Sequence, residues 1–191
     1  MKKLLVLLFC LVAVSVYGQR NRSFDWSLAL QDVKSGEMVP FSTTVPAQTG
    51  EQYRLVVQPS ARCFCYVVTE SANGDVGVLY SGVLRQAESW YSPAMILQQP
   101  GGMESLFIIV SGQEQKTLAQ RVAAYKKNSG SSQKRALMNE VFRVRSDTSA
   151  FRENPEKPVL MGGASRGEPD KNQGLEYSGQ EIYLKTISIE H

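Results

Sequence analysis

The sequence has 191 residues, of which 42% are hydrophobic and 20% charged, with three cysteines and a single histidine. This size and balance suit one globular domain and argue against a disordered chain, a collagen-like repeat or a multidomain enzyme. Because the single histidine is the last residue, His191, one chain can supply neither a histidine-based catalytic triad nor a multi-histidine metal site.

The first 18 residues have the pattern of a secretory signal peptide. Two lysines precede an apolar run over residues 4–14, and small residues around Gly18 offer a cleavage point. The run is shorter than the roughly 20 residues of an ordinary membrane span. We therefore expect a signal peptide over 1–18 and export to the periplasm or extracellular space, with no transmembrane segment after cleavage. An uncleaved N-terminal anchor and lipidation of Cys10 are the alternatives.

Cleavage would change the charge balance of the chain. Loss of the two lysines lowers the formal net charge from +3 to +1. A charge this small gives no reason to expect a nucleic-acid partner.

Residues 19–191 are expected to form a single β-rich domain that begins with three extended segments. Apolar and polar residues alternate over 24–30, which predicts a half-buried strand. A second extended piece over 38–45 is interrupted by Pro40, which suits an edge strand or a bulge. Alternation over 52–58 predicts a third strand.

Two later strands carry apolar residues on both faces, a pattern typical of central strands covered on both sides. They lie at 63–68 and 104–111. The first is followed by Asn73-Gly74, the strongest short hairpin signal, and then by a strand over 76–80. A short extended piece is expected at 94–97.

Cys63 and Cys65 are two residues apart on the first of these strands, so their side chains share a face. Their Cα atoms would be about 7 Å apart, at the limit that a disulfide can bridge. We expect two buried thiols that behave as small hydrophobic groups. A strained redox-active bridge, metal binding and intermolecular pairing remain alternatives.

The hydrophobic period then changes to that of helices. Leu118, Val122 and Tyr125 fall on one helical face within 114–127, and a second apolar stripe follows the small-residue turn and runs to about residue 145. Together they predict a helical hairpin over about 114–145. Packing of this hairpin on one face of the sheet would explain the strands that are apolar on both sides.

The remaining chain is expected to contain a long loop and one closing strand. The Gly/Pro-rich segment over about 154–179 has neither period and predicts a loop. In the strand over 182–189 the apolar positions change phase, which predicts a bulge near Lys185 or Thr186. The expected fold is α+β, mainly β: an antiparallel β-sandwich-like domain with a two-helix hairpin packed on it.

Several of these segments carry a resemblance over about residues 48–118. The similar residues are Gly50-Glu51-Gln52-Tyr53-Arg54-Leu55-Val56-Val57, Phe64-Cys65-Tyr66-Val67-Val68, Asn73-Gly74-Asp75-Val76 with Val78-Leu79-Tyr80, and Gly101-Gly102-Met103-Glu104 leading to Phe107-Ile108-Ile109-Val110-Ser111. The segment resembles the bacterial family called domain of unknown function 4384. Cys63 and Tyr80-Ser81 stand where the family typically has a glycine and a Phe-Pro pair. The resemblance implies a compact β-rich accessory module of exported proteins, with no catalytic residues to carry over.

The expected helical hairpin is strongly basic. Between Arg121 and Arg145 the chain holds seven basic residues and one acidic residue, Glu140. Such a run is most often a solvated helix face, but it can also contact an acidic partner. The candidate contacts are Lys126, Lys127, Lys134 and Arg135.

Two further positions are candidate partner contacts. Arg166 lies in the Gly-rich stretch 161–167, which lacks the lysine and the following helix of a phosphate-binding loop. It is either an exposed loop residue or an anion contact. Trp90 is either an exposed aromatic contact or a side chain that closes over the end of the sheet.

With histidine excluded, catalysis would need a pair of carboxylates, such as Glu153 with Glu156 or Asp25 with Asp32. Nothing in the sequence sets either pair in an apolar pocket. We therefore expect no catalytic residue, no cofactor and no metal. The expected function is an exported, non-catalytic binding or structural module of the bacterial cell envelope, whose partner is a protein or an anionic envelope component. A carboxylate-dependent hydrolase acting on envelope polymers and a regulatory subunit of a membrane-associated complex are the alternatives.

Overall fold

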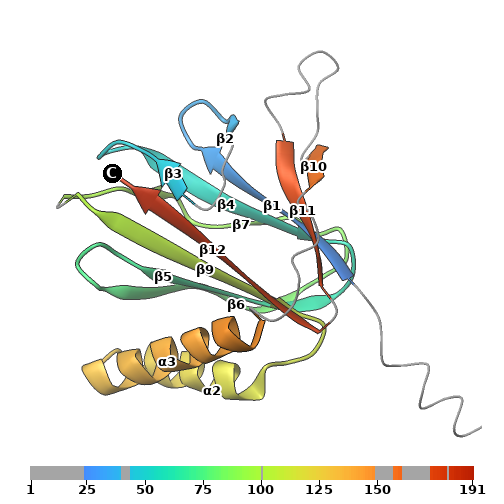
Figure 1. Cartoon of the computed structure of the whole chain (residues 1–191), viewed down its shortest axis with the longest axis vertical. Coiled ribbons are helices and arrows are strands. Elements are labelled where there is room, and N and C mark those ends of the chain that lie inside the picture. The colour runs from blue at the N-terminus through green and yellow to red at the C-terminus, as the bar shows by residue number, and fades with distance from the viewer. Residues whose placement is uncertain (1–23, 40–43, 100, 149–156, 161–172, 180) are drawn as a thin grey trace, which may run out of the picture.

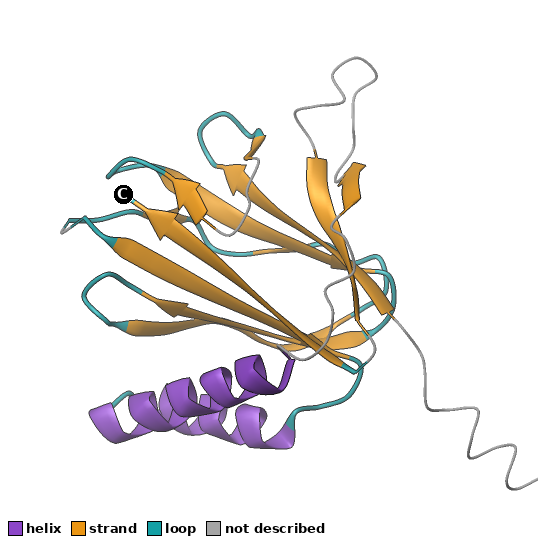
Figure 2. Cartoon of the chain, viewed as in Figure 1, coloured by secondary structure: helices purple, strands orange, loops and turns teal. Residues whose placement is uncertain are grey.

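The computed structural model describes residues 24–39, 44–99, 101–148, 157–160, 173–179 and 181–191. Within these residues the chain forms two β-sheets that face each other, with two helices on the outer side of one sheet (Figures 1 and 2). The expected mainly β, sandwich-like α+β fold is confirmed.

The first sheet is built around the first strand of the described chain. Strand β1 lies between β11 and β4, and the order across the sheet is β10-β11-β1-β4-β7, with β2 paired to β1 and β8 paired to β4. The strands are β1 (Phe24–Asp32), β2 (Met38–Val39), β4 (Gln52–Pro59), β7 (Trp90–Tyr91), β8 (Met95–Ile96), β10 (Lys157–Leu160) and β11 (Gln173–Gly179).

The second sheet has the order β3-β12-β9-β5-β6. Its pairs are antiparallel except for β3, which runs parallel to the last three residues of β12. The strands are β3 (Thr44–Pro46), β5 (Cys63–Glu70), β6 (Val76–Leu84), β9 (Met103–Ser111) and β12 (Ile182–Glu190).

Helices α2 (Lys116–Lys127) and α3 (Ser131–Thr148) form the expected hairpin and cover the outer face of the second sheet (Figure 1). Leu118 and Val141 pack there against Tyr66 and Phe107 from β5 and β9. The opposite faces of the same two strands point into the sandwich. This arrangement confirms that both strands are apolar on two sides because both sides are covered.

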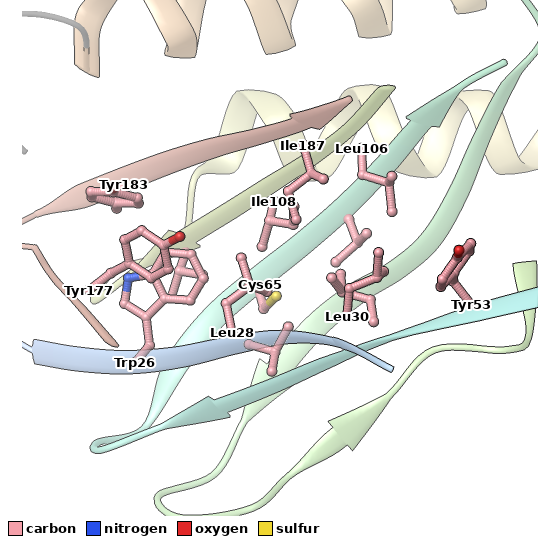
Figure 3. Packing of buried hydrophobic residues seen from close by; sticks show 14 of the residues in the cluster. Trp26, Leu28, Leu30, Tyr53, Cys65, Leu106, Ile108, Tyr177, Tyr183 and Ile187 are labelled. Atoms are coloured by element: carbon pink, nitrogen blue, oxygen red, sulfur yellow. The ribbon is translucent and has the colours of Figure 1, made fainter. Parts of the chain in front are cut away.

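The space between the sheets holds the larger hydrophobic cluster, with aromatic rings at one end (Figure 3). Trp26 stacks on Tyr177 with ring centroids 4.8 Å apart, and Tyr183 meets Trp26 edge-on at 5.3 Å. Since Trp26 belongs to β1, Tyr177 to β11 and Tyr183 to β12, these rings join the two sheets.

The prediction of a segment without strands over 154–179 is wrong where that segment is described. It contains β10 and β11, and β11 pairs with β1 from Phe24↔Gly179 to Leu28↔Leu175. Strand β10 carries Pro158 at the outer edge of the sheet, and edge strands are where proline is found in sheets. The high Gly and Pro content concealed the strand pattern of this segment. Strand β11 forms because it pairs with β1, which is far away in the sequence.

The predicted bulge in the last strand is also wrong. Strand β12 pairs with β9 without a shift of register, and Tyr183, Lys185 and Ile187 all point into the sandwich. The even-numbered residues Ile182 and Leu184 contact the helix-side cluster instead. The apolar positions of β12 only looked as if they changed from even to odd numbers. Both faces of the strand are apolar, and Lys185 occupies one of the buried odd-numbered positions. The register shift lies in the β5–β6 pair, where Leu79 has no partner.

Two shorter predictions also differ from the structure. The extended piece over 38–45 is divided between β2 in the first sheet and β3 in the second, and residues 40–43 lie outside the described chain. Trp90 and Tyr91, for which the sequence predicts no strand, form the two-residue strand β7 against Val57 and Val56 of β4.

Candidate functional site

The turn between the two helices gathers basic side chains at one end of the hairpin. Helix α2 ends in Lys126 and Lys127, and after Asn128–Gly130 helix α3 carries Lys134 and Arg135 in its first turns. We call these four residues the basic corner. Figure 1 shows that the turn lies beside the tip of the β5–β6 hairpin.

Contacts with the β5–β6 hairpin fix the position of the basic corner. The Nζ of Lys126 donates to the Oγ of Ser81 at 3.0 Å, and the hydroxyl of Tyr125 donates to the carbonyl of Val76 at 2.6 Å. The Nζ of Lys134 lies 3.9 Å from the place that a Cβ on Gly74 would occupy. The corner is therefore held against the sheet rather than projecting on a free helix end.

The positive charges of the basic corner are not neutralised within the described residues. Helix α2 has no acidic residue, and none of the four corner side chains forms an ion pair with another described residue. Farther along α3, by contrast, Arg143 contacts Glu140 at 2.7 Å and Asp147 at 2.5 Å. The hydrogen bond to Glu140 raises the pKa of Arg143 above its ordinary value. The corner thus gathers four basic side chains that form no ion pair within the described residues.

The two other predicted contacts have different outcomes. Trp90 is half-buried and packs on Tyr80 with ring centroids 4.8 Å apart, which agrees with a side chain that closes over the end of the sandwich. Its neighbour Tyr91 is exposed, at 46%. Arg166 lies outside the described residues.

The structure does not bring the candidate carboxylates together. Asp25 and Asp32 lie near opposite ends of β1, about 23 Å apart at the rise of an extended strand. Glu153 and Glu156 lie outside the described residues. In the described part of the chain, no three His, Cys, Asp or Glu side chains are grouped so that they could hold a metal ion.

Cys63 and Cys65 are free thiols with no exposed surface, as predicted. Figure 3 shows Cys65 in the sandwich interior, between Leu28 and Ile108. Burial raises the pKa of Cys63 to about 11 and raises the pKa of Cys65 as well. Both groups are therefore protonated near neutral pH and pack as small apolar side chains.

The sequence interpretation missed a buried lysine in the sandwich. Lys185 is only 5% exposed, and its Nζ lies 5.3 Å from the centroid of the Tyr177 ring. Such a contact stabilises a cation by the ring quadrupole. The signal was present as a lysine among odd-numbered apolar positions, but it was interpreted as a break in the strand.

Among the described residues, no helix is both long enough and apolar enough to cross a membrane. Comparisons with protein-family models, curated proteins and solved structures found no match.

Proposed function

We propose that this chain is an exported, non-catalytic binding module of the bacterial cell envelope, and that the basic corner contacts an acidic partner. The observation that carries the proposal is the uncompensated charge of Lys126, Lys127, Lys134 and Arg135 at one end of the helical hairpin. The signal-peptide pattern of residues 1–18 and the resemblance over residues 48–118 support the export and the accessory role.

The physical basis is electrostatic complementarity. Clustered exposed charges raise the local concentration of an oppositely charged partner and orient it on approach. The contact between Lys126 and Ser81 holds part of this cluster in place, which lowers the ordering cost of binding. Since exposed charges are screened within about 8 Å at physiological ionic strength, binding should weaken as salt is added.

The test is charge reversal at the basic corner, followed by crosslinking and pull-down from intact cells. Replacing the four corner residues by Glu should reduce partner recovery by about tenfold at low salt, because attraction becomes repulsion. The matched control reverses four exposed basic residues elsewhere, Lys34, Lys116, Arg121 and Arg145, which changes the net charge equally. Thermal unfolding of both variants checks that the fold is intact.

If the corner variant recovers the same partners as the control, the hairpin is only a solvated face and the proposal is wrong.

A further inference from the structure

Strand β6 forms an edge of the second sheet, and its ladder with β5 is regular except for the register shift at Leu79. It has nine residues, Val76–Leu84, and none of them is charged or a proline. Natural proteins keep edge strands short, interrupt them with proline or place charges on them, because an open row of N–H and C=O groups pairs with other chains.

The other edges among the described strands do carry such protection. Strands β3, β7 and β8 have only two or three residues, and β10 contains Pro158. Strand β12 is paired with β3 only at Ser188–Glu190, but its open stretch contains the inward-pointing Lys185, a recognised device against edge pairing. Strand β6 has one such device, the register shift at Leu79, but it is long and carries neither a charge nor a proline, so the segments on either side of the shift stay open for pairing.

The open part of β6 is its middle. At the start, the Val76 carbonyl accepts from the hydroxyl of Tyr125 in α2. Near the end, the Val83 carbonyl accepts from the hydroxyl of Tyr80 at 3.0 Å and keeps a second lone pair. Among the described residues, the backbone between Gly77 and Gly82 has no hydrogen-bond partner outside the β5 ladder.

Basic groups surround this stretch. Lys126 of the corner contacts Ser81 of β6 directly. Arg62 lies over Phe64, the residue paired with Val83, with its guanidinium carbon 5.6 Å from the ring centroid. Arg85 follows the strand and is exposed, while the nearby acidic residue Glu88 lies beyond it. The acidic residues Glu70 and Asp75 lie at the Val76 end, so it is along Tyr80–Leu84 that an added strand would meet mostly positive charge.

This charge argues against a second copy of the chain as the occupant. Two β6 edges paired about a two-fold axis would bring two copies of the basic corner toward each other across the joined sheet. Like charges placed together in this way disfavour association. The edge suits an acidic strand.

We propose that β6 accepts an extended, acidic segment of a partner protein as an additional strand of the second sheet. Backbone hydrogen bonds along Gly77–Gly82 supply affinity, and the basic corner selects for acidic side chains. This inference rests on the proposed function and specifies the kind of partner.

The experiment uses the full chain, labelled with ¹⁵N, and two synthetic peptides of about ten residues, the usual upper length of a strand. In one peptide Thr and Val alternate with Glu, and in the other they alternate with Lys. Hydrogen exchange is followed at each β6 amide. We expect the acidic peptide to slow exchange about tenfold at those amides of Gly77–Gly82 that point away from β5, which alternate along the strand except at the register shift at Leu79. The lysine peptide should have no effect.

A pair of matched variants tests the charge selection at the strand itself. Val83 is 37% exposed, so Val83→Glu and Val83→Lys remove the same apolar group and both leave the core untouched. The acidic peptide should bind Val83→Glu about tenfold more weakly than Val83→Lys. Thermal unfolding of the two variants verifies that they are equally folded.

Several results would overturn the inference. If the acidic peptide protects only amides of α2 and α3, side chains alone make the contact, and the proposed function survives without strand addition. Equal binding of the lysine peptide, equal affinity of the two Val83 variants, or no binding of the acidic peptide would reject an acidic strand. Dimerisation of the chain through β6 would identify a second copy as the occupant.

Discussion

Replacing the buried thiol of Cys65 by a hydroxyl should destabilise the protein more than removing it. Cys65 has no exposed surface and lies on β5 opposite Gly82 and Val110, in the apolar space between the sheets. Cys65→Ala loses one buried apolar atom and leaves a small cavity, a cost of about 1 kcal/mol. Cys65→Ser keeps a similar volume but buries a hydroxyl among apolar neighbours, a cost of roughly 2–3 kcal/mol.

The difference is measured by thermal unfolding in reducing buffer, followed by tryptophan fluorescence, to which the buried Trp26 contributes. For a domain of this size the serine variant should unfold roughly 5–10 °C below the original chain, and the alanine variant about half as far below. Thr117→Ser, on the exposed side of α2, serves as a control that should change nothing measurable. A serine variant as stable as the alanine variant would refute the reasoning, because its hydroxyl would then have found a polar partner.

Three further predictions concern thiol access, backbone strain and acid sensitivity. Cys63 and Cys65 should react with about two equivalents of thiol reagent only after unfolding, and quantitative labelling of the native chain would contradict their burial. Ala87 has a φ of 57°, so Ala87→Gly should raise the free energy of unfolding by about 0.5 kcal/mol in urea titrations; a loss of stability would show that the backbone there is unstrained. The pKa of Asp32 is lowered chiefly by the Ser35 backbone N–H and that of Glu51 chiefly by the Tyr53 hydroxyl. A lowered pKa stabilises the fold above the unfolded-state value and loses that contribution as pH falls through the folded-state value. Between pH 7 and pH 3, Asp32→Asn combined with Glu51→Gln should therefore lose less stability than the original chain, and an unchanged pH profile would count against these hydrogen bonds.

The features predicted correctly are those that a few neighbouring residues determine. Asn73-Gly74 predicts the β5–β6 hairpin because Gly74 adopts a positive φ, here 81°, at no steric cost. The apolar faces of β5 and β9 predict cover on both sides, which the first sheet and the helices provide. In each case the local pattern and the final structure agree.

The errors concern strands whose identity depends on distant partners. Strand β11 becomes a strand by pairing with β1, more than a hundred residues earlier in the chain. The inward position of Lys185 depends on the register with β9 and on the ring of Tyr177 beneath it. Neither strand partner can be identified from the neighbouring residues alone, so the lysine among apolar positions was open to the wrong interpretation.

For the candidate site, too, the sequence shows the type of each residue but not how the residues are placed in space. The sequence shows that Lys126, Lys127, Lys134 and Arg135 are basic, but their convergence beside the β5–β6 hairpin depends on the helix ends and on contacts such as Lys126 with Ser81. Likewise, the uncharged composition of β6 becomes informative only when the strand order shows that it lies at an edge.

The strand order also dictates when the chain can fold. Strand β1 has β11 on one side, and β12 lies between β3 and β9, so both sheets are completed by the last segments of the described chain. Trp26, near the start, finds its stacking partner only when Tyr177 is present. Contacts this distant in sequence require closure of long loops before any packing energy is gained, which places folding in the slow millisecond-to-second class of β-sandwiches. A growing chain that has not yet reached β11 and β12 therefore cannot complete either sheet, and its apolar strands stay uncovered until those two strands are present.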